Sequence, residues 1–158
     1  MNLLCNLDNR SLNAEHQTQR TTQIAVLILT YNEEQHLARA LESIRNISRE
    51  VFVIDSFSSD ATVVIAQRYG AIVLQNKFVN QAKQFQWALD NASINADWVL
   101  RLDADEIIEE DLQATILEKL PGLPDDVVGV NFKRKHIFMD RWVRHGGRYP
   151  LIMTRLFR

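Results

Sequence analysis

The stretch Ile24-Ala25-Val26-Leu27-Ile28-Leu29, followed at once by Thr30-Tyr31-Asn32-Glu33, decides the fold class. A short, wholly apolar run with β-branched residues is typical of a strand that is buried on both faces. The polar residues after it end the strand. Apolar side chains then recur at helical spacing, which predicts a helix over residues 33–46.

The same alternation of apolar run and amphipathic segment continues along the chain. Strands are predicted over residues 51–54, 71–74, 98–102 and 127–132, and helices between Asp60 and Gly70, over about 81–92, and before Pro121. This order predicts an α/β fold with a mainly parallel sheet and helices on both faces. Residues 1–22 show no sustained period, so we expect a flexible N-terminal tail before one domain over 23–158.

Composition excludes several classes of protein. The 158 residues fit one domain, and a formal net charge of -2 gives no overall attraction to nucleic acid, so no nucleic-acid partner is expected. A single cysteine, Cys5, excludes an internal disulfide framework and a cysteine-rich zinc site. No apolar run approaches the roughly 20 residues that span a bilayer, and the first residues make a poor signal peptide. We therefore expect a cytoplasmic protein.

Polar clusters follow three of the predicted strands. They are Thr30-Tyr31-Asn32-Glu33, Asp55-Ser56 and Asp103-Ala104-Asp105. In parallel α/β sheets ligands bind beyond the carboxyl ends of the strands, so we expect these clusters to converge in one crevice.

Asp103 and Asp105 are the strongest candidates for chemistry. In an extended chain they would point to the same side, forming a hard-oxygen site for Mg²⁺ or Mn²⁺. Magnesium completes its shell with substrate phosphates, which predicts a diphosphate ligand. One carboxylate could instead accept a hydrogen bond from a ribose hydroxyl. The alternative is a solvated acidic loop that favours the N-terminus of the next helix.

Three motifs in order carry a family resemblance that covers residues 24–158. They are VLILTYNEE over residues 26–34, VIDSFSSDAT over 53–62 and LDADE over 102–106. These closely resemble the family 2 glycosyltransferases of the GT-A fold, and especially the bacterial enzymes that build lipopolysaccharide core, capsule or exopolysaccharide.

The resemblance implies an inverting, metal-dependent hexosyltransferase-like enzyme. Such an enzyme moves a sugar from a nucleoside-diphosphate sugar, usually UDP-linked, to a hydroxyl of a glycan or glycolipid acceptor, in some cases at the inner membrane surface. It implies that Tyr31 stacks on the base, Asp55 binds the base edge, Asp103 contacts the ribose and Asp105 holds the metal. The predicted nucleotide-sugar site comprises Thr30, Tyr31, Asn32, Glu33, Asp55, Lys83, Asp103, Ala104 and Asp105, with Asp105 and Asp103 as metal ligands.

The chain departs from the family pattern in two ways. In the second motif Phe57, Ser59 and Ala61 stand where relatives commonly have Gly, Thr and Gly. Family enzymes also run well beyond Arg158, and their general base lies in that later part, so no catalytic base is assigned and the acceptor portion is expected to be missing. The alternative function is therefore a catalytically incomplete nucleotide-sugar-binding fragment.

Two other interpretations compete for the same residues. An Asp-x-Asp pair also occurs in haloacid-dehalogenase-like phosphatases, but there it follows the first strand, which here ends in Thr30-Tyr31-Asn32. The last quarter is locally basic, from Lys133-Arg134-Lys135 to Arg148, with Trp142 interleaved. We expect it to face phosphate groups of donor, acceptor or anionic lipid rather than nucleic acid.

Overall fold

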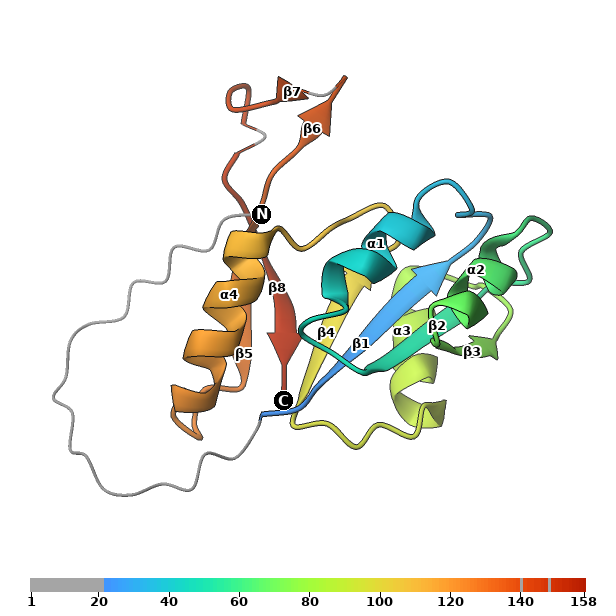
Figure 1. Cartoon of the computed structure of the whole chain (residues 1–158), viewed down its shortest axis with the longest axis horizontal. Helices are drawn as coiled ribbons and strands as arrows, with labels where there is room; N and C mark the ends of the chain where they lie inside the picture. Colours follow the sequence, from blue (N-terminus) through green and yellow to red (C-terminus); the bar gives the residue numbers. More distant parts are fainter. Residues whose placement is uncertain (1–21, 140, 148) are drawn as a thin grey trace, which may run out of the picture.

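The structure, a computed structural model, describes residues 22–139, 141–147 and 149–158 (Figure 1). The expected flexible tail therefore lies, except for residue 22, outside the described residues. In chain order the elements are β1 (Ile24–Thr30), α1 (Leu37–Ile44), β2 (Glu50–Asp55), α2 (Thr62–Arg68), β3 (Ile72–Gln75), α3 (Gln81–Asn91), β4 (Trp98–Asp103), α4 (Glu110–Lys119), the 3-10 turn η1 (Leu120–Gly122), β5 (Gly129–Arg134), β6 (Ile137–Phe138), β7 (Arg141–Trp142) and β8 (Leu151–Phe157).

One six-stranded sheet runs through the molecule in the order β3-β2-β1-β4-β8-β5. The strands β3, β2, β1 and β4 are parallel, whereas β8 pairs antiparallel with both β4 and β5. The predicted α/β fold with a mainly parallel sheet is confirmed. The strand β8, which lies between β4 and β5, was not predicted from the sequence.

Helices cover both faces of this sheet, as Figure 1 shows. On one face α1, α2 and α4 pack on the larger core cluster, to which Leu37, Ala66 and Leu112 belong. On the other face α3 packs on a second cluster through Ala88 and Phe85. Alternate residues of β1 serve the two clusters, which explains why its sequence is apolar at every position.

The chain changes direction within the sheet between β1 and β4. From β1 it adds β2 and β3 on one side, and then returns to add β4 on the other side of β1. Ligands in open α/β sheets bind beyond the carboxyl ends of strands at such a switch point. The ends of β1 and β4 therefore mark where a site is expected.

One predicted helix is shorter than expected. The helix over residues 33–46 is observed as Leu37–Ile44, because residues 33–36 form turns in which the carbonyl of Glu33 accepts from the N–H groups of His36 and Leu37. Within the part of the chain that the structure describes, no helix has the length and apolar character needed to cross a membrane.

Candidate functional site

The polar ends of three strands lie side by side at one edge of the sheet. Thr30 of β1 pairs with Asp55 of β2, and Leu29 of β1 pairs with Asp103 of β4. Neighbouring strands lie about 4.8 Å apart, so the backbones of Asp55 and Asp103 are about two strand spacings, or roughly 10 Å, apart. The strand ends that the sequence predicts to converge do converge.

Asp55 is the centre of a buried hydrogen-bond network. Its carboxylate is fully buried and accepts from Thr30 Oγ1 at 3.2 Å, from the backbone N–H of Ser58 at 2.9 Å, from Gln75 Nε2 at 3.1 Å, and from Ser58 Oγ. A buried carboxylate is costly without such donors. Asp55 therefore fixes the course of the loop after β2.

The loops after β1 and β2 are bound to each other in both directions. The backbone N–H groups of Asn32 and Glu33 donate to Ser58 Oγ at 2.8 Å and to Thr62 Oγ1 at 2.7 Å. In return, the Asn32 side-chain oxygen accepts from the N–H of Ser59 at 2.9 Å. The structure thus shows Asn32 and Glu33 joining the two loops, while Tyr31 between them remains 62% exposed.

Two residues of these loops have left-handed backbone conformations. Asn32 has a φ of 54° and Phe57 a φ of 62°. Asparagine tolerates this region, but a side chain of phenylalanine size is disfavoured there. The glycine that relatives commonly have at the position of Phe57 is explained by this backbone requirement. Here Phe57 meets it with its ring 57% exposed.

The Asp103–Asp105 pair does not have the geometry that the sequence suggests. Strand β4 ends at Asp103, and a turn follows in which the N–H of Glu106 donates to the carbonyl of Asp103 at 2.9 Å. The extended backbone expected from Asp103 to Asp105 is therefore wrong. Asp103 is half-buried, Ala104 is buried, and Asp105 is exposed, so the two carboxylates have different surroundings.

The group that binds Asp103 was not predicted from the sequence. Arg155 of β8 is only 1% exposed, and its Nη2 donates to Asp103 Oδ2 at 2.8 Å and to Glu106 Oε1 at 2.7 Å. Arg134 Nη1 lies 3.4 Å from the same Glu106 oxygen, and Arg101 Nε lies 3.8 Å from Asp103 Oδ1. We call these five residues the Arg155 cluster. A signal was present in the sequence, because Arg155 is a charged residue inside a strand-forming stretch, between Leu151-Ile152-Met153-Thr154 and Leu156-Phe157. An arginine is rarely buried in such a stretch unless it is paired with an acid.

The cluster shifts the pKa of both of its acids. Burial alone would raise the pKa of Asp103, but the hydrogen bond and charge of Arg155, with the charges of Arg101 and Arg134, outweigh it and lower that pKa. For Glu106 burial prevails, with help from the charge of Asp103, and its pKa is raised despite Arg155. Asp103 is thus the acid whose charged form the cluster stabilises.

Lys83 lies in the first turn of α3, next to Gln84, whose Nε2 lies 3.3 Å from Ser56 Oγ at the end of β2. This helix starts after the loop that follows β3, and its first turn is capped by Asn80 Oδ1, which accepts from the Lys83 backbone N–H at 2.9 Å. The Lys83 side chain is exposed. No hydrogen bond or ion pair joins it to another described residue, so its ammonium group is available to an anion.

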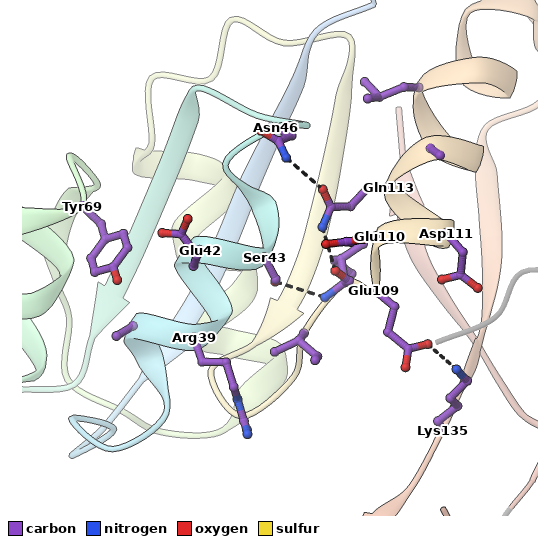
Figure 2. Close-up of a pocket in the computed structure, with 15 residues that line it drawn as sticks. Arg39, Glu42, Ser43, Asn46, Tyr69, Glu109, Glu110, Asp111, Gln113 and Lys135 are labelled. Atoms are coloured by element: carbon purple, nitrogen blue, oxygen red, sulfur yellow. Dashed lines mark hydrogen bonds and ion pairs between the residues drawn. The ribbon is translucent and has the colours of Figure 1, made fainter.

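A groove lies beside these strand ends. It has a volume of about 1100 Å³ and lies between α1 and α4 (Figure 2). Cross-groove contacts limit its depth: Asn46 Nδ2 lies 3.4 Å from Gln113 Oε1, and the Ile108 N–H donates to Ser43 Oγ at 3.1 Å. It approaches the Asp103–Asp105 turn at Arg39, whose Nη2 lies 3.5 Å from the Asp105 carbonyl oxygen. The groove is therefore a neighbour of the candidate site and not part of it.

The donor set fits a divalent ion that is shared with a ligand. Among the described residues no group of three or more His, Cys, Asp or Glu side chains could enclose a metal. Asp105, however, presents an exposed carboxylate to which no described side chain donates. Magnesium needs only one or two protein carboxylates when substrate phosphates and water supply the rest. Asp105 meets that requirement, with Asp103 held beside it by Arg155.

Comparison with known proteins assigns the family. The sequence profile described as "Glycosyl transferase family 2" matches residues 25–158, which is most of the chain. The chain belongs to glycosyl transferase family 2. The predicted family resemblance is confirmed.

Two bacterial glycosyltransferases are similar to this chain. An uncharacterized glycosyltransferase of Rickettsia conorii is 42% identical over 96 residues, which cover 61% of this chain and 33% of that protein. The lipopolysaccharide core biosynthesis glycosyltransferase LpsC of Rhizobium meliloti is 29% identical over 117 residues, covering 71% of this chain and 42% of LpsC. The chain thus spans between a third and a half of the length of these relatives.

A solved structure supports the GT-A fold. Glucosyl-3-phosphoglycerate synthase of Mycobacterium tuberculosis, crystallised with UDP, matches with a TM-score of 0.58 and 23% identity, over 73% of this chain and 46% of the other. At that identity the match supports only the fold of this chain.

Proposed function

We propose that this glycosyltransferase domain binds a UDP-linked sugar at the edge formed by the ends of β1, β2 and β4. In the whole protein the sugar would be transferred with inversion to a hydroxyl of a bacterial cell-surface glycan or glycolipid. The observation that carries the proposal is the exposed carboxylate of Asp105, which lies beside the adjoining strand ends of Thr30, Asp55 and Asp103. Support for the donor comes from the family motifs and from the UDP held by a solved protein of this fold.

Each residue of the site has a role that follows from its surroundings. Tyr31 is exposed above the edge and offers an aromatic face for the base. Asp55, with its carboxylate taken up by four donors, shapes the loop beside the base. Asp103 uses the oxygen that Arg155 does not bind to accept from a ribose hydroxyl, and Lys83 attracts the diphosphate.

Asp105 would hold Mg²⁺ or Mn²⁺, and Asp103 would support it. When bound, the ion supplies positive charge that stabilises the departing nucleoside diphosphate. The protein's own contribution is to keep the Asp105 carboxylate free and the neighbouring charge balanced. The Arg155 cluster contains three cations and two acids, so adding Asp105 brings the local formal charge to zero.

A second candidate function is nucleotide-sugar binding without transfer by this chain. The match covers 33% of the Rickettsia conorii relative. No described residue is assigned as the base that deprotonates the acceptor. The lipopolysaccharide role in the name of LpsC supports a glycolipid or glycan acceptor at a membrane surface, and we propose that location for this chain.

Calorimetric titration with UDP, with and without Mn²⁺, tests the donor site. We expect metal-stimulated UDP binding that Asp105→Ala abolishes while circular dichroism and thermal unfolding stay unchanged. The matched control is Asp126→Ala, which removes an exposed carboxylate far from the strand ends and should bind as the unmodified chain does. Equal Mn²⁺-stimulated affinity in Asp105→Ala would refute the assignment. Assaying sugar transfer with the same protein separates binding from turnover.

A further inference from the structure

The β6–β7 hairpin carries three consecutive exposed apolar side chains. Ile137 is 55% exposed, Phe138 61% and Met139 82%. In Figure 1 the hairpin stands away from the six-stranded sheet, at the end of β5 and before β8. Adjacent residues of a strand point to opposite faces, so exposure of both Ile137 and Phe138 means that neither face of the tip packs on the described core. Clustered exposed apolar residues of this kind mark an interaction site.

Charge is strongly segregated toward the same segment. Residues 133–152 contain six lysine and arginine residues and one aspartate, a formal charge of +5, whereas the rest of the chain carries -7. Two of these cations are engaged within the body, since Arg134 pairs with Glu106 and Lys135 with Glu109. Arg141 and Arg144 are exposed and form no ion pair with a described residue. The hairpin residues 137–142 carry one aspartate and one arginine and are neutral, so the positive charge lies in the segments that flank the hairpin, while the rest of the chain is acidic.

Aromatic rings lie just behind the apolar tip. Trp142 pairs with Ile137 across the hairpin and is half-buried. The Arg144 guanidinium lies 4.2 Å from the Trp142 ring centroid, and Tyr149 meets that ring edge-on at 5.0 Å. Arg141 pairs with Phe138. Arg141 thus lies level with Phe138 at the apolar end of the hairpin, and Trp142, with Arg144 and Tyr149 against its ring, lies one pair further from the tip.

We propose that the β6–β7 hairpin docks on an anionic membrane surface. The tip enters the boundary between headgroups and acyl chains, Arg141 and Arg144 face lipid phosphates, and Trp142 and Tyr149 lie at headgroup depth. Nucleic acid would satisfy the arginines but would leave Ile137 and Met139 in water. A lipid surface matches both the apolar tip and the positive charge. This inference rests on the membrane location given in the proposed function. Its test uses no nucleotide, so the hairpin proposal and the donor-site proposal can each fail without the other.

Co-sedimentation of the folded chain with vesicles tests the hairpin. We expect binding to phosphatidylglycerol–phosphatidylcholine vesicles and little binding to phosphatidylcholine alone. Binding to the anionic vesicles should weaken as salt rises from about 50 to about 500 mM, because screening of the charges increases strongly over that range. Phe138→Ser with Met139→Ser should lower the partition coefficient by at least about tenfold, because the apolar area is lost. Arg141→Gln with Arg144→Gln should lower it about fivefold for each arginine.

Two matched controls keep the test specific to the hairpin. Leu117→Ser with Val128→Ser removes apolar side chains that are 51% and 67% exposed at the far ends of α4 and β5. Arg45→Gln with Arg49→Gln removes two exposed charges, one at the end of α1 and one just before β2. This variant has the same net charge as the hairpin arginine variant. Both should bind vesicles as the unmodified chain does.

Several outcomes would overturn the proposal. They are no sedimentation with anionic vesicles, equal loss in the control variants, or hairpin variants that sediment normally. A labelled single-stranded oligonucleotide gives the remaining arm. Tighter binding to it than to vesicles, lost in the same arginine variants but not in Phe138→Ser with Met139→Ser, would assign the surface to nucleic acid instead.

Discussion

The Nη2 atom of Arg155 donates a 2.8 Å hydrogen bond to Oδ2 of Asp103, joining β8 to the motif that ends β4. The same nitrogen contacts Glu106 at 2.7 Å, so one buried cation holds both acids that flank the exposed Asp105. The antiparallel strand that sequence analysis did not predict thus supplies the counter-charge of the candidate site. The position of Asp103 depends on β8 as much as on its own strand.

Removing Arg155 should weaken both the fold and the site. Arg155→Met leaves two part-buried carboxylates with weaker partners, although it also removes the Nε and Nη1 groups, which lack hydrogen-bond partners among the described residues. We expect a loss of about 2 to 3 kcal/mol in the free energy of unfolding, below the larger values for fully paired ions. Urea titration at pH 7 measures it, with UDP–Mn²⁺ affinity as a second measurement.

Two further variants identify the cause of that loss. Arg155→Lys keeps the charge but lacks the planar fork, so it should recover part of both stability and affinity. Arg45→Gln breaks the exposed pair with Glu42, whose side chains are 77% and 58% exposed, and should change stability by less than about 0.5 kcal/mol. An Arg155→Met chain as stable as the unmodified one would contradict the importance of the cluster.

The pKa of Asp103 gives its contribution a definite pH dependence. Because the folded-state pKa is lowered, the contribution is present above the unfolded value of 3.8 and is lost as pH falls through the folded-state pKa. We expect Asp103→Asn to be less stable than the unmodified chain at pH 7, by about 1.5 to 3 kcal/mol. The difference should shrink below pH 3.8. Denaturant titrations of both proteins at several pH values measure this, and a pH-independent difference would show that the charge is not its cause.

Phe57 should be a site where glycine stabilises the protein. Its φ of 62° disfavours any large side chain, and its exposed ring contributes little burial. Phe57→Gly should raise the free energy of unfolding by about 1 kcal/mol, which is partly offset by the greater freedom of glycine in the unfolded chain. Gly70→Ala is the opposite control. Gly70 has a φ of 78° with open space around it, so the alanine variant should have a free energy of unfolding lower by about 1 kcal/mol. Thermal unfolding of both variants checks the signs.

Most of the α/β architecture could be predicted because its central strands β1, β2 and β4 are largely buried. The apolar run of β1 and the strand preceding Asp103 leave little alternative, and the alternation with helices fixes a parallel sheet. The helix after β1 was harder. The backbone N–H groups of Asn32 and Glu33 bind side chains that follow β2, and the helix begins only at Leu37. Those side chains, of Ser58 and Thr62, lie 26 and 29 residues away in sequence.

The site was predicted in part for the same physical reason. Asp55 and Asp103 each follow an apolar run directly, so the local pattern alone predicts that each lies at the end of a strand. Arg155 is located by the antiparallel pairing of β8 with β4, a contact 52 residues from Asp103 that no local period encodes. The Asp103–Asp105 geometry was wrong because a turn closes immediately at the strand end.

Asp55 and Asp105 should separate structural from binding roles within one site. Asp55→Ala removes an acceptor of four hydrogen bonds from a fully buried position and leaves its donors unpaired, so it should cost about 3 kcal/mol or more and loosen both loops. Asp105→Ala removes an exposed carboxylate and should change stability by less than about 0.5 kcal/mol. For Asp55→Ala, UDP affinity should fall with and without Mn²⁺, because the loops that carry Tyr31 are disordered. For Asp105→Ala, only the metal-dependent part should fall. Titrating each variant with UDP at a temperature well below its own unfolding midpoint separates the two effects, and a stable Asp55→Ala chain that loses only metal-stimulated binding would reverse the assigned roles.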